Sequence, residues 1–436
     1  MEPGLLGIIV LIVMILMLSL GIPIAFTLCS ITTVGVLATW GPSGLYLLFN
    51  TAYAESTSFL LLAVPLFIFM ANQLKFSGMG DDLYEMVYRW MGNLSGGLAI
   101  GTVVICAIFA AMAGISSVAT ISMGLIALPS MLSRGYDKNL AVGSISAGGA
   151  LGILIPPSII MILYGAMTEV SVGKLFIGGI IPGFLLCLIF IGYIVVRTLF
   201  NRNLAPPVAE RYSFKEKLLA LKNILSPILL VLLVLGVIYF GICTPTEASA
   251  VGAFGAIVCA ALQKKLTWKN LKESLWSTTK LTSMVFWLII GANAFAHFLA
   301  FTEIQGLIKD GVLALNVSRW TILIAIQVIY FLLGMFLDPA GILMLTTPLF
   351  VPIITELGFD PLWFGILFTL NMEMAYVTPP FGFNLFIMKS IVPPEIKMAD
   401  IYRAIIPFVL LQALALLLIM IFPALATWLP NLMIGG

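Results

Sequence analysis

Long apolar stretches recur from one end of the chain to the other, with few charges inside them. Two examples are LLGIIVLIVMILMLSL near the start and SPILLVLLVLGVIYFGI near the middle. A helix needs roughly 20 apolar residues to cross a bilayer, so the pattern predicts an all-α polytopic membrane protein in a lipid bilayer. Of the 436 residues, 61% are hydrophobic and only 9% are charged. We expect no separate soluble domain.

Composition argues against several function classes. The five cysteines are scattered without a C-x-x-C pair, and His297 is the single histidine. A histidine metal site, a catalytic triad or a paired intramembrane catalytic set is therefore not expected, and we predict that the chain is not an enzyme. It contains no G-x-x-x-x-G-K-[ST] motif, so it has no P-loop for ATP. We expect no nucleic-acid partner.

Basic residues gather in two linkers and orient the chain. They lie at 197–222 and at KKLTWKNLKES, 264–274, and two apolar spans near 223–242 and 247–263 separate them. By the positive-inside rule both linkers face the cytoplasm. The start, Met1-Glu2-Pro3, lacks the basic flank of a signal peptide, so the first segment is expected to stay as a membrane helix. The count of spans predicts a periplasmic N-terminus.

Two segments share a pattern of helix-breaking residues at a constant offset of 223 residues. The matched positions are Pro129 and Pro352, Gly135 and Gly358, Tyr136 and Phe359, Asp137 and Asp360, and the pairs Pro156–Pro157 and Pro379–Pro380. An ungapped match of six features predicts an internal duplication. Two ordinary helix pairs with proline kinks are the alternative, but they leave the matched spacing unexplained.

A broken hydrophobic run precedes each Pro-Pro pair. The breaks are AGISS, 113–117, and GMFLDPAG, 334–341. The pieces on either side are short, so each run is interpreted as a re-entrant helical hairpin, followed by a broken helix that spans 138–167 in the first copy. Counting from the basic linkers puts the 134–138 corner in the cytoplasm and the 357–361 corner outside. The sequence therefore predicts an inverted repeat.

Discontinuous helices in inverted-repeat transporters often form ion sites near the membrane midplane. Proline lacks an N–H, so carbonyls three or four residues before each Pro-Pro pair lose their helical partners, and hard carbonyl oxygens suit a small cation. We predict sodium ligands at equivalent positions of the two breaks: Gly152, Ile155 and Pro157, and Ala375, Thr378 and Pro380. Ser158 and Asn384 follow the breaks and are candidates for contact with the substrate.

The hairpin breaks carry polar residues of their own. Ser116 and Ser117 stand where the N-cap of the returning helix is expected. In the second copy Asp338 precedes Pro339, which is the pattern of an N-cap followed by proline at the first helical position. Asp338 is either an ion ligand or only a cap.

Four other polar features are interpreted separately, and Glu373 alone keeps several alternatives. Glu373 lies in the second broken helix and faces a cavity, a gating contact or a neighbouring helix. Glu247 follows Pro245 and is expected to be a helix-start carboxylate favoured by the helix dipole. His297 is interpreted as an interior residue with a satisfied hydrogen bond. The segment 78–93 is predicted to be an amphipathic interfacial helix.

Several motifs together resemble a known family. They are GISSVATISMGLIALPSMLSRGYDKNLAVGSISAGGALGILIPPSIIMILYG, TPTEASAVGA and YVTPPFGFNLF. They resemble the large membrane subunit, called DctM-like, of TRAP transporters, the tripartite ATP-independent periplasmic transporters. The likeness extends across essentially the whole chain. No four-helix segment precedes the first span, so the large subunit alone is expected rather than a fused form.

The resemblance implies an elevator-type transporter of the bacterial inner membrane, with a scaffold and a mobile transport domain. It implies a separate small four-helix membrane subunit, a periplasmic substrate-binding protein that delivers an organic acid such as a C4-dicarboxylate or a sialic acid, and coupling to a sodium gradient. The family's ligand positions map to Ser116, Ser117, Gly152, Ile155, Pro157, Asp338 and Thr378. Because the second hairpin has Asp-Pro where the first has Ser-Ser, the two ligand sets need not be symmetric.

These expectations divide the chain into scaffold and transport segments. The predicted segments are 1–92, scaffold helices and amphipathic arm; 93–170, first transport half; 171–280, scaffold helices with basic loops; 281–392, second transport half; and 393–436, a C-terminal helix. A self-sufficient sodium-coupled dicarboxylate or anion carrier, needing no binding protein, is the alternative function. Dependence of uptake on a binding protein separates the two.

Overall fold

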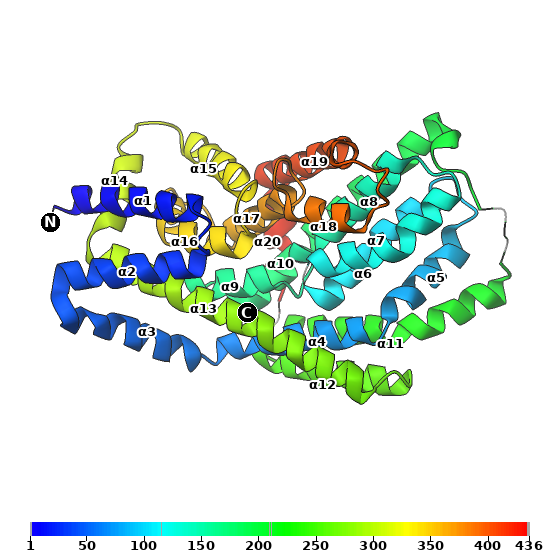
Figure 1. Ribbon diagram of the computed structural model, residues 1–436, viewed down its shortest axis with the longest axis horizontal. Coiled ribbons are helices and arrows are strands. Elements are labelled where there is room, and N and C mark those ends of the chain that lie inside the picture. The colour runs from blue at the N-terminus through cyan, green and yellow to red at the C-terminus, as the bar shows by residue number, and fades with distance from the viewer. Residues whose placement is uncertain (1, 115, 209, 211, 434–436) are drawn as a thin grey trace.

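The structure is a computed structural model that describes residues 2–114, 116–208, 210 and 212–433 (Figure 1). Over this part of the chain the secondary structure is entirely helical. The helices of eight residues or more, in chain order, are α1 (Pro3–Ser19), α2 (Ile24–Trp40), α3 (Tyr46–Ser56), α4 (Ala63–Phe76), α5 (Met79–Met91), α6 (Gly97–Ala113), α7 (Ser116–Ser133), α8 (Lys138–Ala150), α9 (Ile159–Thr168), α10 (Val172–Phe200), α11 (Phe214–Tyr239), α12 (Pro245–Leu262), α13 (Trp268–Phe301), α14 (Ile304–Leu313), α15 (Arg319–Gly334), α16 (Pro339–Glu356), α17 (Pro361–Ala375), α18 (Phe383–Ile391), α19 (Met398–Ile421) and α20 (Ala424–Asn431).

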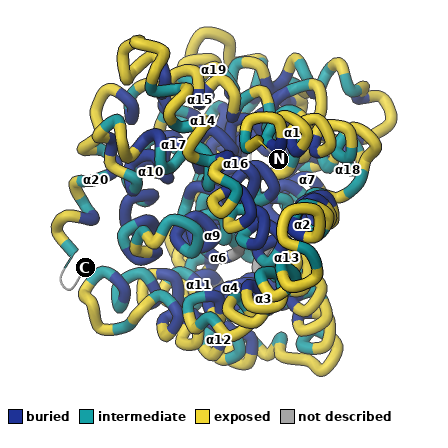
Figure 2. The backbone as a smooth tube through the Cα atoms, turned by 90° about the vertical axis from the view of Figure 1, so that its left-hand side faces the viewer, coloured by how far each residue is buried: buried dark blue, intermediate teal, exposed yellow. Residues whose placement is uncertain are grey.

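The structure confirms a polytopic helical membrane protein. Seven helices of the described chain are long and apolar enough to cross a bilayer. The span expected near 247–263 is α12, and the one expected near 223–242 lies in α11. Exposed residues form an outer rim around a buried centre in Figure 2. Many exposed side chains are large and apolar, as contact with lipid requires.

The internal repeat is longer than the sequence motifs indicated. Helices α7 and α16 run from residue 116 to 133 and from 339 to 356, so both ends are 223 residues apart. Helix α11 is bent, and its second part is Ile224–Tyr239. Within a few residues the same offset relates α1 to this second part, α2 to α12, α3 and α4 to α13, α5 to α14, α6 to α15, α8 to α17, α9 to α18, and α10 to α19. One difference between the copies is that α3 and α4 are separated where α13 is continuous.

The two copies face opposite ways. In Figure 1 the connections α5–α6 and α7–α8 lie at the right-hand end of the molecule, whereas the equivalent connection α14–α15 lies at the left. The helical hairpins α6–α7 and α15–α16 therefore extend inward from opposite ends. The N-terminus is at the left, and the linker between α10 and α11 is at the right. We call the right-hand end the basic end, because that linker carries the first basic cluster.

Local sequence accounts for where the hairpins and broken helices begin. Asp137 caps α8 by accepting a hydrogen bond from the Leu140 N–H at 2.9 Å, and Asp360 caps α17 through the Leu362 N–H at 2.8 Å. The preceding corner glycines have φ of 77° at Gly135 and 75° at Gly358. These left-handed conformations favour glycine because it lacks a Cβ. The repeated Gly-aromatic-Asp pattern is thus a repeated turn and cap.

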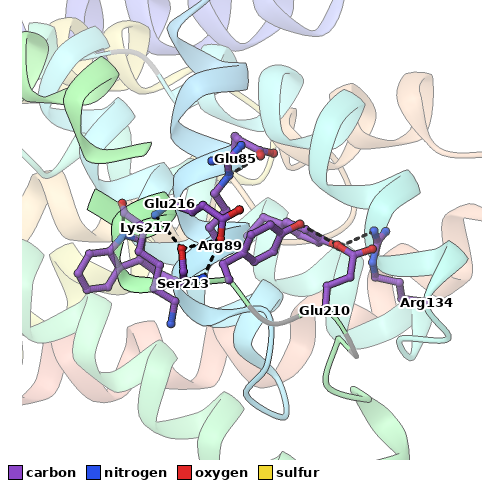
Figure 3. Close-up of polar contacts among 10 residues, drawn as sticks. Glu85, Arg89, Arg134, Glu210, Ser213, Glu216 and Lys217 are labelled. Atoms are coloured by element: carbon purple, nitrogen blue, oxygen red, sulfur yellow. Dashed lines mark hydrogen bonds and ion pairs between the residues drawn. The ribbon is translucent and has the colours of Figure 1, made fainter. Parts of the chain in front are cut away.

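The linker between α10 and α11 is held against the first hairpin by a polar cluster (Figure 3). The hydroxyls of Tyr212 and Tyr88 donate to the Glu210 carboxylate at 2.7 and 2.9 Å, and these bonds lower the pKa of that carboxyl from its ordinary value. Arg134, at the base of the hairpin, donates to the Tyr88 hydroxyl at 2.9 Å. Helix α5, the predicted amphipathic arm, supplies Tyr88 and so joins the linker to the hairpin.

Candidate functional site

The tip of the first hairpin lies between parts of both broken helices. Gly114 ends α6 with φ of 58°, and a Cβ added there would be 2.4 Å from the Pro157 carbonyl oxygen. Ser116 begins α7, is buried, and accepts a hydrogen bond from the Asn384 side-chain amide at 2.6 Å. Asn384 lies in α18, after the second Pro-Pro pair. Residues from three distant segments therefore meet at this tip.

The first Pro-Pro loop has backbone oxygens without donors. Helix α8 ends in a short 3-10 turn, and the Ile155 N–H bonds back to the Leu151 carbonyl at 2.9 Å. The carbonyls of Gly152, Ile155 and Pro157 accept no hydrogen bond from the described residues. Buried carbonyls are normally paired, so these oxygens are available to a ligand. This arrangement is the one expected where proline removes helical donors.

The second Pro-Pro loop is more fully bonded. The Ala375 carbonyl accepts from the Thr378 N–H at 3.0 Å, and the Thr378 carbonyl accepts from the Gly382 N–H at 2.9 Å. The Tyr402 hydroxyl donates to the Pro380 carbonyl at 2.8 Å. The Thr378 hydroxyl itself donates to the Met374 carbonyl at 2.7 Å. Each carbonyl has a second lone pair, so ligation there would add to an existing bond.

The second hairpin tip approaches its own broken helix through small residues. A Cβ added at Gly334, where α15 ends, would be 2.2 Å from the Ala375 Cβ. Asp338 caps α16 and accepts from the Gly341 N–H at 2.9 Å, as its sequence pattern predicts. Its side chain is exposed and lies within electrostatic range of Tyr376. The cap is confirmed, and the second carboxylate oxygen of Asp338 takes no part in this capping bond.

The two predicted substrate residues differ in what their side chains do. The Ser158 hydroxyl caps α9 by accepting from the Met161 N–H, and it donates to the Ile153 carbonyl at 2.5 Å. Its hydrogen-bonding capacity is largely used within the loop. The Asn384 amide nitrogen bonds Ser116, but its Oδ1 is buried and finds no partner among the described residues. Asn384 therefore offers a free acceptor beside the first hairpin tip. Ser117, next to Ser116, is partly buried.

Sequence reasoning did not single out Gly114 or the partner of Glu373. The only local signal for Gly114 was its place in AGISS. Glu373 is fully buried in α17, and the Gln412 amide of α19 approaches its Oε1 at 3.4 Å. Its Oε2 and the Gln412 Oε1 have no partner in the described chain. A neighbouring helix, one of the three predicted surroundings, thus faces Glu373.

Glu247 and His297 have different outcomes. Glu247 forms a capping box at the start of α12, accepting from the Thr244 N–H at 2.8 Å. The predicted helix-start carboxylate is confirmed. His297 is hydrogen-bonded to the Thr51 hydroxyl at 3.2 Å, but its side chain is exposed. The satisfied hydrogen bond is confirmed, but the interior placement was wrong, because packing against α3 leaves the His297 side chain exposed.

An apolar cleft of about 700 Å³ lies between α6, α10 and α11. Ile155 and Pro156 of the first Pro-Pro loop contribute to its wall, and the other walls are almost wholly apolar. An anion would lose its hydration there without replacement, so the cleft is not suited to an acidic substrate. Groups of three or more His, Cys, Asp or Glu side chains that could hold a metal do not occur in the described part of the chain.

Two repeats of opposite orientation, with hairpin tips placed against unwound helices, define an architecture of secondary transporters. A solved structure supports this fold class. The chain is similar to the YdaH transporter of Alcanivorax borkumensis, with a TM-score of 0.62, 15% sequence identity and coverage of 99% of each chain. At this level of identity the similarity concerns the fold alone.

Sequence comparison gives the family. Residues 11–425 match the model of the tripartite ATP-independent periplasmic transporter, DctM component, and the chain belongs to this family. It is 36% identical over 380 residues to the C4-dicarboxylate TRAP transporter large permease protein DctM of Pseudomonas aeruginosa, covering 87% of this chain and 88% of the relative. It is 32% identical over 425 residues to the ectoine TRAP transporter large permease protein TeaC of Halomonas elongata, covering 96% and 97%. The chain is a TRAP large permease and not an enzyme.

Proposed function

We propose that this permease imports an anionic organic acid in symport with sodium, by an elevator-type movement of the transport segments 93–170 and 281–392 against the scaffold. A small four-helix membrane subunit and a periplasmic substrate-binding protein complete the transporter. The relatives' names include a C4-dicarboxylate and ectoine, so the acid class is left to experiment. The membrane is the bacterial inner membrane, with the N-terminus in the periplasm and the basic end in the cytoplasm.

The observation that carries the proposal is the set of unpartnered oxygens at the first hairpin. The carbonyls of Gly152, Ile155 and Pro157 accept no hydrogen bond from described residues, and the buried Asn384 Oδ1 is likewise without a donor. Hard cations prefer oxygen ligands, and buried acceptors without donors cost free energy unless a ligand binds them. We assign the three carbonyls to sodium and leave the Asn384 Oδ1 to a donor group of the substrate.

The ligand assignment follows the repeat. In the first copy the proposed sodium ligands are Ser116, Ser117, Gly152, Ile155 and Pro157. In the second copy they are Asp338, Ala375, Thr378 and Pro380. The second set is the weaker one, because three of its carbonyls already accept hydrogen bonds. The substrate is placed beside Asn384 and Ser158, between the hairpin tips.

Elevator movement needs hairpins that re-enter from one face and a transport unit that slides past the scaffold. The tip of the α6–α7 hairpin packs against the Pro157 carbonyl and the buried Asn384 side chain, so the hairpin ends inside the protein, which supports re-entry. The apolar cleft between α6 and α11 supports a sliding boundary, since the described residues that line it form no hydrogen bond across it that movement would break.

Reconstituted uptake tests the function. The chain and its small subunit are placed in proteoliposomes with a radiolabelled acid, the cognate binding protein and an inward sodium gradient, without ATP. We expect uptake only when both sodium and the binding protein are present. Equal uptake without the binding protein would favour the self-sufficient carrier, and uptake independent of sodium would refute the coupling.

A further inference from the structure

A small recess lies between α8, α10 and α19, at the basic end. Its volume is about 120 Å³. Arg197 and Arg403 line it together with Asp137, Asn139 and Tyr193. Two T-shaped ring contacts, from Phe190 and Tyr193 to Phe408, hold α10 against α19 beside it, with ring centroids 5.4 and 5.2 Å apart. The recess therefore has a fixed frame.

Both guanidinium groups are left without a partner in the described chain. Arg197 and Arg403 are exposed and form no hydrogen bond or ion pair with any described residue. The acidic groups nearby are already engaged. Asp400 pairs with Lys138 at 2.8 Å, and Asp137 accepts the capping bond from the Leu140 N–H. Asp137 and Asp400 balance part of the charge of Arg197, Arg403 and Lys138. Three cations against two carboxylates leave one net positive charge for an external anion.

The repeat supplies an internal comparison for these two arginines. Helices α10 and α19 are equivalent in the two inverted copies. If the copies were identical, a second recess would therefore lie at the opposite end of this helix pair. With the offset of 223 residues, Arg403 corresponds to Ile180, and Arg197 corresponds to Met420. Both equivalents are apolar. The shared fold therefore does not require the pair of arginines, which occurs at the basic end of this helix pair alone.

An apolar surface continues from the recess toward the middle of the membrane. Ile406 and Leu410 follow Arg403 by three and seven residues, which places all three on one face of α19. Their side chains are 53% and 66% exposed. A ligand with an anionic head and hydrocarbon chains could therefore contact the arginines and this face together.

We propose that the recess binds the phosphate group of an anionic phospholipid in the leaflet at the basic end. Arginine presents several N–H donors in a planar fork that suits phosphate oxygens. Basic pockets between membrane helices on the cytoplasmic side are sites for anionic head groups. Asn139 and Tyr193 add neutral donors for the remaining oxygens. The acyl chains lie along Ile406 and Leu410.

Native mass spectrometry of the purified full-length chain in detergent tests this site. Phosphatidylglycerol and phosphatidylcholine with the same acyl chains are titrated separately. We expect the double variant Arg197→Gln/Arg403→Gln to bind phosphatidylglycerol about thirtyfold more weakly than the native chain, because each basic residue contributes about 1 kcal/mol at a membrane surface and about 1.4 kcal/mol corresponds to a factor of ten. The variant Arg197→Lys/Arg403→Lys keeps the charge and should restore part of the binding.

A matched control removes two charges elsewhere at the same end. Lys269 and Lys272 are exposed at the start of α13, and Lys269→Gln/Lys272→Gln should leave phosphatidylglycerol binding unchanged. Thermal unfolding verifies that each variant is folded. Equal loss in both double variants, no loss in the arginine variant, or equal binding of phosphatidylcholine would overturn the proposal. Displacement of the lipid by millimolar inorganic phosphate would assign the recess to a free anion instead.

Discussion

The most direct test of the proposed ion site is the substitution Gly114→Ala. Gly114 has φ of 58°, and an added Cβ would be 2.4 Å from the Pro157 carbonyl oxygen. The left-handed backbone alone makes alanine about 1 kcal/mol less favourable than glycine. Because a carbon and an oxygen normally approach to about 3.4 Å, the hairpin tip or the carbonyl must also move by about 1 Å.

A displacement of that size should weaken sodium binding more than it weakens the fold. An ion site holds its oxygens at set distances, so moving one ligand by about 1 Å removes it from the coordination shell. We expect the sodium concentration for half-maximal uptake to rise at least tenfold, about 1.4 kcal/mol. Proteoliposome uptake at varied sodium, with saturating binding protein, measures this value, and thermal unfolding in detergent measures the stability.

Gly135→Ala is the matched control. Gly135 has φ of 77°, similar to Gly114, but nothing lies within 4 Å of an added Cβ. This variant carries the backbone cost without the contact at Pro157. If both variants give the same half-saturating sodium concentration, the close approach of Gly114 to Pro157 is not part of the sodium site, and the reasoning fails.

Three further predictions follow from contacts in the structure. Thr378→Val removes the hydroxyl that donates to the Met374 carbonyl, and Gly152→Leu crowds the first loop. Both variants should still insert into the membrane but show a weaker dependence of uptake on sodium. Unchanged sodium affinity in both would contradict the ligand assignment. Asn384→Leu removes a buried hydrogen bond to Ser116 and should lower the free energy of unfolding by about 1–3 kcal/mol. In a double-mutant cycle with Ser116→Ala, the two changes in the free energy of unfolding should be non-additive, because both substitutions remove the same bond. The tyrosine hydroxyls lower the pKa of the Glu210 carboxyl in the folded protein. The stabilisation of the linker by Glu210 is therefore fully present above the ordinary carboxyl pKa of about 4.3. It is lost as the pH falls through the lower pKa of the folded protein. Hydrogen exchange of the α10–α11 linker should therefore accelerate below about pH 4 in the native chain, whereas Glu210→Gln should remove that dependence.

The difference between the two Pro-Pro loops bears on how the ion sites would work. The first loop leaves three carbonyls without donors, whereas the second bonds its equivalents through Thr378, Gly382 and Tyr402. Symmetric sequence positions thus have different bonding partners. From Asp-Pro in place of Ser-Ser at the hairpin breaks, the sequence predicted only that the two ligand sets need not be symmetric.

The sequence by itself determined the local elements and their repetition. Apolar length, Pro-Pro pairs and an aspartate before proline act within a few residues, so the breaks at 113–117 and 334–341 and the cap at Asp338 could be predicted from local order alone. The constant offset extended that prediction to the second copy.

Only the tertiary structure decided which atoms meet. The bond between Asn384 and Ser116 joins residues 268 positions apart, and the contact of Gly114 with Pro157 depends on how the first hairpin packs. The exposure of His297 likewise depends on how far α3 covers α13. Such contacts are set by the packing of whole helices, which local propensity does not encode, and so the oxygens left open for an ion could not be identified before the fold was known.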